Sequence, residues 1–313
     1  MVKEFVGILK QYGVIGLAIA VIIGGTPVAS VAQTPATAVV MLGTGTPNAD
    51  PDRSGPAVAV VRAGRSYLVD AGPGVVRRAS AAAALHADSS LQPQNLRTLF
   101  LTHLHSDHTV GLPDLILSAW TLEREVPLEV YGPPGTQAMV DHLLAAYAAD
   151  IRNRIDGLEP ANPTGYQVRV HEIAPGKVFE DGNVTVTAFA VPHGDWAVAF
   201  GYRFQSADRS IVISGDTRAS DAVVRACDGC DLLVHEVYSA ERFRTRPPAW
   251  QAYHAKAHTS TTELADVARR AAPKQLLLYH QLFWGTTDEG LMAETRAAGY
   301  KGPMRSAADL TRY

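Results

Sequence analysis

Cysteine is scarce in this chain: two of its 313 residues are cysteines, Cys227 and Cys230. Both stand in one Cys-Asp-Gly-Cys segment, so no second pair is present to complete a four-cysteine zinc site. A redox pair and half of a zinc site are alternative roles for this segment, and a disulfide could form here if the protein is exported. We expect instead an ordinary turn after a helix, with two small, partly buried side chains.

An excess of positive charge is also missing. The chain has 28 lysine and arginine residues against 31 aspartate and glutamate residues, for a formal net charge of −3. Nucleic-acid-binding domains usually show a basic patch and a high isoelectric point. The overall charge therefore predicts no general attraction to nucleic acid, although a local basic patch stays open.

The apolar run near the N-terminus, residues 14–25, is short. It spans about a dozen residues, whereas a membrane-spanning helix needs about 20. Two lysines precede it, and small residues follow it up to Ala32, as in a secretory signal. We predict a signal peptide at 1–32, cleavage before Gln33, and export to the periplasm or medium. An uncleaved N-terminal membrane anchor is the alternative, and the folded part is 33–313 in both cases.

Signatures of several catalytic classes are absent. No Gly-x-Ser-x-Gly segment occurs, which argues against a Ser-His-Asp mechanism. Gly43-Thr44-Gly45 lacks the third glycine of a dinucleotide-binding fingerprint and the lysine of a P-loop. We interpret this segment as a turn.

The pattern along the chain alternates strands and helices, separated by Gly, Pro and Asp. The first half predicts strands at 38–42, 57–61, 66–69, 97–101 and 127–131, and helices at 75–85, 110–120 and 135–149. The second half predicts strands at 168–173, 184–191, 199–204, 210–214, 232–235 and 275–279, and helices at 221–226, 260–271 and 288–298. No Pro- or Ser-rich linker divides the halves. We predict one α/β domain of two sheets packed face to face, with helices outside.

The most informative segment is Thr-His-Leu-His-Ser-Asp-His at 102–108, directly after the predicted strand. It brings together three imidazoles and a carboxylate: His103, His105, Asp107 and His108. Imidazole nitrogen and carboxylate oxygen suit Zn²⁺ and other borderline divalent metals. Because four such groups are costly to leave unpaired, the segment predicts a metal site rather than a chance cluster of surface histidines.

Three further candidate ligands each follow a predicted strand: His193, Asp216 and His280. Strand ends in layered α/β folds are common places for sites, because a rigid sheet holds the loops there. Singly, each residue is as well explained by a turn or a surface position. Together with the first segment they make seven ligands, too many for one tetrahedral zinc and suited to two metals that share a carboxylate.

This ligand pattern resembles that of the metallo-β-lactamase superfamily, and within it the ribonuclease Z and arylsulfatase-like group. The opening segment Met-Leu-Gly-Thr-Gly-Thr-Pro at 41–47 is similar too. The resemblance implies an αββα sandwich from about Ala38 onward and two Zn²⁺, with Mn²⁺ or Fe²⁺ in one site as an alternative. It assigns His103, His105 and His193 to the first metal. It assigns Asp107, His108 and His280 to the second, with Asp216 as the bridge. Asp70 would support a ligand.

Two other segments carry the resemblance to ribonuclease Z. His-Glu-Val-Tyr at 235–238 resembles its His-Glu-Ala-Thr segment, and 257–261 resembles its His-Ser-Thr segment. The resemblance implies that Glu236 orients His258 and keeps it protonated, and that His258 protonates the leaving group. Asp107 would position a hydroxide that bridges the metals. The alternatives are a solvated Glu236, a structural His258 before a helix cap, and His254 as a rival acid.

The first substrate that the resemblance implies is precursor tRNA. Ribonuclease Z, however, grips tRNA with a basic arm between the third histidine ligand and the bridging aspartate. Here His193 and Asp216 are 23 positions apart, which leaves no room for an arm, and export would separate the protein from tRNA. We therefore predict hydrolysis of small esters, aryl sulfate or phosphodiester. Ribonuclease Z-type cleavage, lactone or β-lactam hydrolysis, and a non-catalytic metal-binding role are the alternatives.

The expected partner is thus a small ester and not nucleic acid. Membrane association through the N-terminal segment and a homodimer stay open. Five aromatic residues are candidates to line a pocket for an aromatic group: Trp196, Trp250, Tyr253, Phe283 and Trp284. Their alternative role is ordinary core or surface packing.

Overall fold

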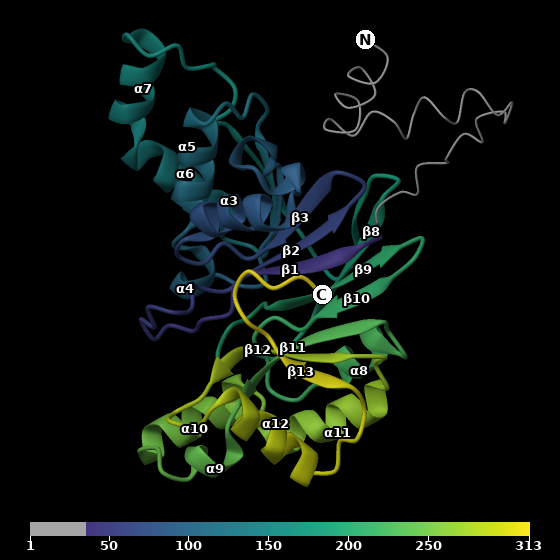
Figure 1. Ribbon diagram of the computed structural model, residues 1–313. Helices are drawn as coiled ribbons and strands as arrows, with labels where there is room; N and C mark the ends of the chain where they lie inside the picture. Colours follow the sequence, from purple (N-terminus) through teal and green to yellow (C-terminus); the bar gives the residue numbers. More distant parts are fainter. Residues whose placement is uncertain (1–35) are drawn as a thin grey trace, which may run out of the picture. The chain divides into compact units, whose positions relative to one another are not determined.

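The computed structural model describes residues 36–313 (Figure 1). The predicted signal peptide or anchor at 1–32 lies outside the described residues, so its cleavage stays a prediction. Between residues 36 and 313, no helix combines the length and the apolar character that crossing a membrane requires.

Two β-sheets form the centre of the fold. The first has the strands in chain order: β1 (Ala38–Gly43), β2 (Ala57–Arg62), β3 (Arg65–Val69), β4 (Thr98–Phe100), β5 (Leu128–Gly132) and β6 (Val168–Glu172). The second runs, across the sheet, β13 (Met304–Ser306), β12 (Leu276–Leu282), β11 (Leu232–Tyr238), β10 (Ser210–Ile213), β9 (Phe200–Ser206), β8 (Val184–Ala190) and β7 (Gly176–Glu180). Strands β3 to β6 are parallel, as are β10 to β13, so their carboxyl ends can gather functional loops.

Helices cover the outer face of each sheet (Figure 1). The first sheet is followed or covered by α3 (Val75–His86), α4 (Ser106–Thr109), α5 (Leu112–Thr121), α6 (Thr136–Ala146) and α7 (Ala148–Asp156), with two short 3-10 helices at Ser89–Leu91 and Pro93–Asn95. The second carries α8 (Asp221–Cys227), α9 (Ala240–Phe243), α10 (Pro248–Ala257), α11 (Thr261–Ala271) and α12 (Asp288–Ala297). This arrangement confirms the predicted αββα sandwich.

The alternation of side chains along β1 shows how one strand serves two apolar layers. Val40 and Leu42 pack among the helices of the first half, whereas Val39 and Met41 pack in the layer between the two sheets. All four are fully buried. Successive side chains of a strand point to opposite faces of the sheet. A strand that is buried on both faces must therefore be apolar along its whole length.

Most predicted elements are present, but the loops of the second half hold more structure than expected. Strands β7 and β13 and helices α9 and α10 were not predicted. The helix expected at 110–120 is α5, and the short helix α4 before it was not predicted. The helix expected at 135–149 is interrupted at Tyr147. Strand β12 extends to Leu282, so it includes His280 instead of ending before it.

The turn predicted after a helix at Cys227–Cys230 is present, but its two cysteines are fully buried and are joined in the disulfide that export was expected to allow. Helix α8 ends at Cys227, and Asp228 and Gly229 both take left-handed conformations, with φ of 40° and 76°. These two residues bring the cysteine Cα atoms to 4.7 Å, within the range that a disulfide spans. The segment is therefore a covalently closed turn.

Candidate metal centre

Asp70 fixes the loop that follows β4. This buried carboxylate lies just after β3 and accepts hydrogen bonds from the Thr102 backbone N–H at 2.8 Å and from the Thr102 hydroxyl. It also lies 2.8 Å from Nδ1 of His108 on α4. A carboxylate bound to one ring nitrogen orients the other as a ligand, so Asp70 has the supporting position that the sequence predicted.

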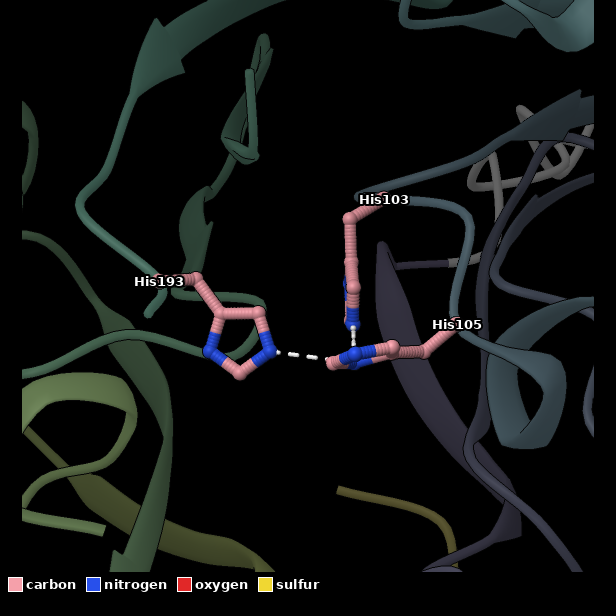
Figure 2. Close-up of side chains that lie close together, drawn as sticks. All are labelled: His103, His105 and His193. Carbon is pink, nitrogen blue, oxygen red and sulfur yellow. Dashed lines mark hydrogen bonds between the residues drawn. The ribbon is translucent and has the colours of Figure 1, made fainter. Parts of the chain in front are cut away.

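Three histidine rings converge at the end of β4 and β8 (Figure 2). Nδ1 of His105 lies 2.9 Å from Nε2 of His103 and 3.1 Å from Nε2 of His193. His193 Nδ1 lies 2.7 Å from the Ala257 carbonyl oxygen, which requires Nδ1 to carry the proton and leaves Nε2 unprotonated. The structure thus gathers the three residues that were predicted to hold the first metal.

The second group is Asp107, His108 and His280, and Asp216 lies between the two groups. Asp107 Oδ2 is 3.3 Å from His280 Nε2 and 3.4 Å from His108 Nε2. Asp216 Oδ2 lies 3.4 Å from His108 Nε2, 3.5 Å from His280 Nε2 and 4.0 Å from His193 Nε2. All seven predicted ligand side chains therefore meet at one place, and Asp216 has the position of a bridge.

His280 reaches this cluster through an irregularity in β12. Glu236 pairs with Tyr279 and Val237 pairs with Gln281, so His280 is an extra residue with no partner on β11. Its backbone has φ of 44°, the left-handed region that non-glycine residues seldom adopt. A bulge of this kind changes the direction of one side chain, which here points to Asp107 and Asp216.

Charge pairing dominates the electrostatics of the cluster. Burial lowers the pKa of His103 and His193, and lowers that of His105 to about 4. Burial opposes charge on His108 and His280 as well, yet the negative charge of Asp216 raises the pKa of both. Burial likewise opposes charge on Asp216, but His280 and His108 hold its pKa well below the ordinary value. The buried carboxylates therefore require positive charge close to them.

Divalent cations fit this set of donors. His108 Nε2 and Asp216 Oδ1 are buried and have no hydrogen-bond partner, a costly condition that coordination would remove. The seven residues form three groups of three, and within each group the ligand atoms lie within 4.8 Å of one another. The groups are His103/His105/His193, His103/His108/Asp216 and Asp107/His108/His280. Imidazole and carboxylate donors suit zinc, and other borderline divalent metals as well.

Glu236 and His258 form a buried pair beside the cluster. His258 Nδ1 is 3.1 Å from Glu236 Oε1 and 4.0 Å from Asp216 Oδ2. Glu236 Oε1 also accepts the backbone N–H groups of Thr217 and Thr259. Glu236 is thus fully buried and bonded, and not a solvated loop carboxylate.

Both members of this pair favour their neutral forms. Burial, reinforced by Asp216, raises the pKa of Glu236 well above its ordinary value. Burial lowers the pKa of His258 to about 4. These pKa directions run against the expectation that Glu236 keeps His258 protonated. A neutral His258 donates its Nδ1–H to Glu236, which leaves Nε2 as an acceptor.

A cavity of about 620 Å³ opens onto the cluster. It is lined by residues of the cluster and by three aromatic residues: Asp107, Asp216, His258 and His280, with Trp250, Tyr253 and Trp284. Of the five predicted pocket aromatics, these three line this cavity. Trp196 lies at a neighbouring cavity with His105 and His193, and Phe283 packs under Arg53.

Three side chains of this region have contacts that the sequence did not predict. His254 is buried between the rings of Trp250 and Trp284, so it forms part of the aromatic wall. Arg246 also lines the cavity, and sequence reasoning missed it because no motif surrounds it. Trp196 donates its Nε1–H to His105 Nε2 at 2.8 Å, a contact between distant residues that no sequence pattern signals.

Comparisons with known proteins agree with this geometry. A family model described as "Beta-lactamase superfamily domain" matches residues 65–281. Ribonuclease Z of Mycobacterium sp. (strain KMS) is 36% identical over 246 residues, which cover 78% of this chain and 84% of the relative. Ribonuclease Z of Mycobacterium bovis (strain BCG / Pasteur 1173P2) is 33% identical over 245 residues, which cover 77% and 85%.

Solved structures show the same fold. The metallo-β-lactamase fold protein YhfI from Bacillus subtilis aligns with a TM-score of 0.68 and 17% identity, over 88% of this chain and 98% of its own. The short form of human tRNase Z aligns with a TM-score of 0.63 and 24% identity, again over 88% and 98%. The named relatives support the ribonuclease Z alternative better than the aryl sulfate cleavage that we predicted.

Proposed function

Because the chain belongs to the metallo-β-lactamase superfamily and its relatives are ribonuclease Z proteins, we propose that it is a metal-dependent phosphodiesterase of the ribonuclease Z type. The observation that carries this proposal is the Glu236–His258 pair, 4.0 Å from Asp216 in the ligand cluster. Metal ligands alone would suit a storage or structural site. An oriented imidazole that lines the same cavity supplies the proton transfer that hydrolysis needs.

His103, His105 and His193 would hold one metal, and Asp107, His108 and His280 the other, with Asp216 shared. Two bound Zn²⁺ would polarise the phosphoryl group and make a nucleophile available at neutral pH. Asp70 and the Ala257 carbonyl hold His108 and His193 in the orientation that coordination needs. Asp107, which lines the cavity, would also position the attacking water.

His258 would move the proton. Its Nδ1–H is held by Glu236, so its unprotonated Nε2 can accept the proton that the attacking water releases. The carboxylate of Asp216, 4.0 Å from His258 Nδ1, would stabilise the imidazolium formed in this way. The imidazolium then returns the proton to the leaving alcohol oxygen, so that water and a phosphodiester give a phosphomonoester and an alcohol.

A second candidate, hydrolysis of small phosphodiesters or aryl esters outside the cytoplasm, is favoured by two observations. The paired strands β9 and β10 lie within the short interval between His193 and Asp216, and no arm extends from it. The Cys227–Cys230 disulfide suits an oxidising compartment, in agreement with the proposed export. On this proposal the mature protein begins at Gln33, which mass spectrometry of the exported protein would test.

One set of assays separates these candidates. Precursor tRNA, bis-p-nitrophenyl phosphate and p-nitrophenyl sulfate would be tested with zinc-loaded wild type. Cleavage of precursor tRNA supports the ribonuclease Z proposal. Hydrolysis of the diester without tRNA cleavage supports the second candidate. If the protein has its full metal content and catalyses neither reaction, both candidates are contradicted.

Variants test the proposed proton carrier. We expect His258→Ala to lower kcat on bis-p-nitrophenyl phosphate by about 10²- to 10⁴-fold, the usual contribution of general acid–base catalysis. Its zinc content should stay that of wild type. His142→Ala is the matched control, because His142 is exposed on α6. Equal activity of both variants would contradict the role of His258.

A further inference from the structure

Arg246 is an arginine without a carboxylate partner in the wall of the catalytic cavity. It lies between α9 and α10, and it makes no salt bridge with any residue between 36 and 313. Its Nε is buried and has no hydrogen-bond partner. Because a buried charged donor is costly to leave unpaired, this guanidinium lacks an anion.

Packing holds the guanidinium in place. Its Cζ lies 5.2 Å from the centre of the Trp284 ring, within the range of a cation–π contact. Trp284 packs in turn on His254, with ring centres 4.7 Å apart. Gln251 Nε2 donates to the Arg246 carbonyl oxygen at 2.7 Å, which fixes the backbone. The side chain is thus positioned before any ligand arrives.

The cavity places this cation beside the catalytic groups. Arg246 lines the same space of about 620 Å³ as Asp107, Asp216 and His258. Among the described residues, no other arginine or lysine lines this cavity. A space of this size takes a ligand of several ring and phosphate units. The half-exposed Trp250 ring in the same wall offers a face on which a base can stack.

We propose that the substrate of this site is a phosphodiester that carries a second anionic group, and that Arg246 binds this second group. The inference rests on the proposed phosphodiesterase function and specifies its substrate class. A phosphate matches the planar fork of donors of arginine, which binds such oxygens in pairs. Aryl sulfates and simple diesters have a single anionic group, which the bound metals and His258 would engage, so these substrates would leave Arg246 unpaired.

The test compares substrates that differ by one phosphate: the dinucleotide UpU and its 5′- and 3′-phosphorylated forms, pUpU and UpUp. We expect zinc-loaded wild type to favour one phosphorylated form over UpU in kcat/KM by about tenfold or more, the usual effect of a charge-assisted hydrogen bond. Arg246→Gln should remove this preference, because it raises KM for the favoured phosphorylated form. Arg246→Lys should restore part of it, since charge remains without the fork.

Arg244→Gln is the matched control, because it removes an equal charge from an exposed neighbour outside the cavity. Equal use of the three dinucleotides by wild type would overturn the proposal, as would an equal loss of preference in both variants. If wild type with full metal content hydrolyses no diester, the proposed function fails. Binding of pUpU and UpUp, followed by tryptophan fluorescence, then decides the role of Arg246: weaker binding in Arg246→Gln alone supports it, and unchanged binding overturns it.

Discussion

At the scale of single residues, the partner of each histidine decides which ring nitrogen can bind a metal. His193 donates its Nδ1–H to the Ala257 carbonyl oxygen, and His108 Nδ1 is hydrogen-bonded to Asp70. Nε2 of each ring therefore faces the cluster. His105 is arranged in the opposite sense, with Nδ1 toward His103 and His193. Ligand type and spacing could be predicted from the sequence, but these tautomers could not, because their partners come from distant strands and loops.

Trp196 should report metal binding at the first site. Indole N–H is a donor only, so its bond to His105 Nε2 requires Nε2 to be unprotonated. A metal on Nδ1 of neutral His105 requires the proton on Nε2, which breaks this bond. We expect zinc added to chelator-treated protein to change tryptophan fluorescence in wild type and much less in Trp196→Phe. The same change in both proteins would contradict this arrangement.

His235 should make the metal-free protein sensitive to acid. Burial lowers its pKa to about 4, below the value of about 6.5 for an exposed histidine. The unfolded chain therefore binds the proton more readily, so this contribution to stability is complete above pH 6.5 and is lost as the pH falls to about 4. The full effect is on the order of 3 kcal/mol.

His235→Phe removes this titration and fills similar space. We expect its free energy of unfolding in urea, measured in chelator between pH 4 and 7, to depend less on pH than that of wild type. The other buried histidines remain in both proteins, so they cancel in the comparison. Parallel pH curves for the two proteins would show that His235 does not contribute.

At the scale of elements, regular patterns were predictable and irregular ones were not. Ser260 and Glu263 form a capping box at the start of α11, and a serine followed by a glutamate three residues later is a local signal of such a cap. Strand β12 (Leu276–Leu282), in contrast, is buried along its whole length. Its sequence therefore does not show at which residue the pairing with the neighbouring strand skips a position. The bulge at His280 depends on pairing with β11, so its signal lies in another part of the chain.

The bulge gives a prediction about stability. At φ of 44°, His280 is in a conformation that glycine adopts freely and β-branched residues adopt at a high cost. His280→Gly and His280→Val both remove the ligand. We expect the valine variant to be less stable than the glycine variant by about 1–2 kcal/mol in urea unfolding with chelator present. A more stable valine variant would contradict the strain at this position.

At the scale of the whole molecule, the sheet order brings the two halves of the chain to one centre. The segments after β4, β8 and β10 and the bulge in β12 supply the ligands, and the loop after β3 supplies the supporting Asp70. The αββα class and the seven ligand positions could be predicted because alternating elements and strand-end histidines are local signals. Three aromatic residues of the cavity wall were predicted as candidates, but helices α9 and α10 beside them were not, because Pro247 and Pro248 interrupt the helical pattern between the two.

The central claim is that the clustered ligands hold two catalytic metals. The measurement that tests it most directly is kcat/KM on bis-p-nitrophenyl phosphate as zinc is titrated into chelator-treated protein. We expect activity to be absent without metal and to reach its plateau at about two zinc ions per chain, the stoichiometry of a two-metal site. Full activity of the metal-free protein would contradict the account.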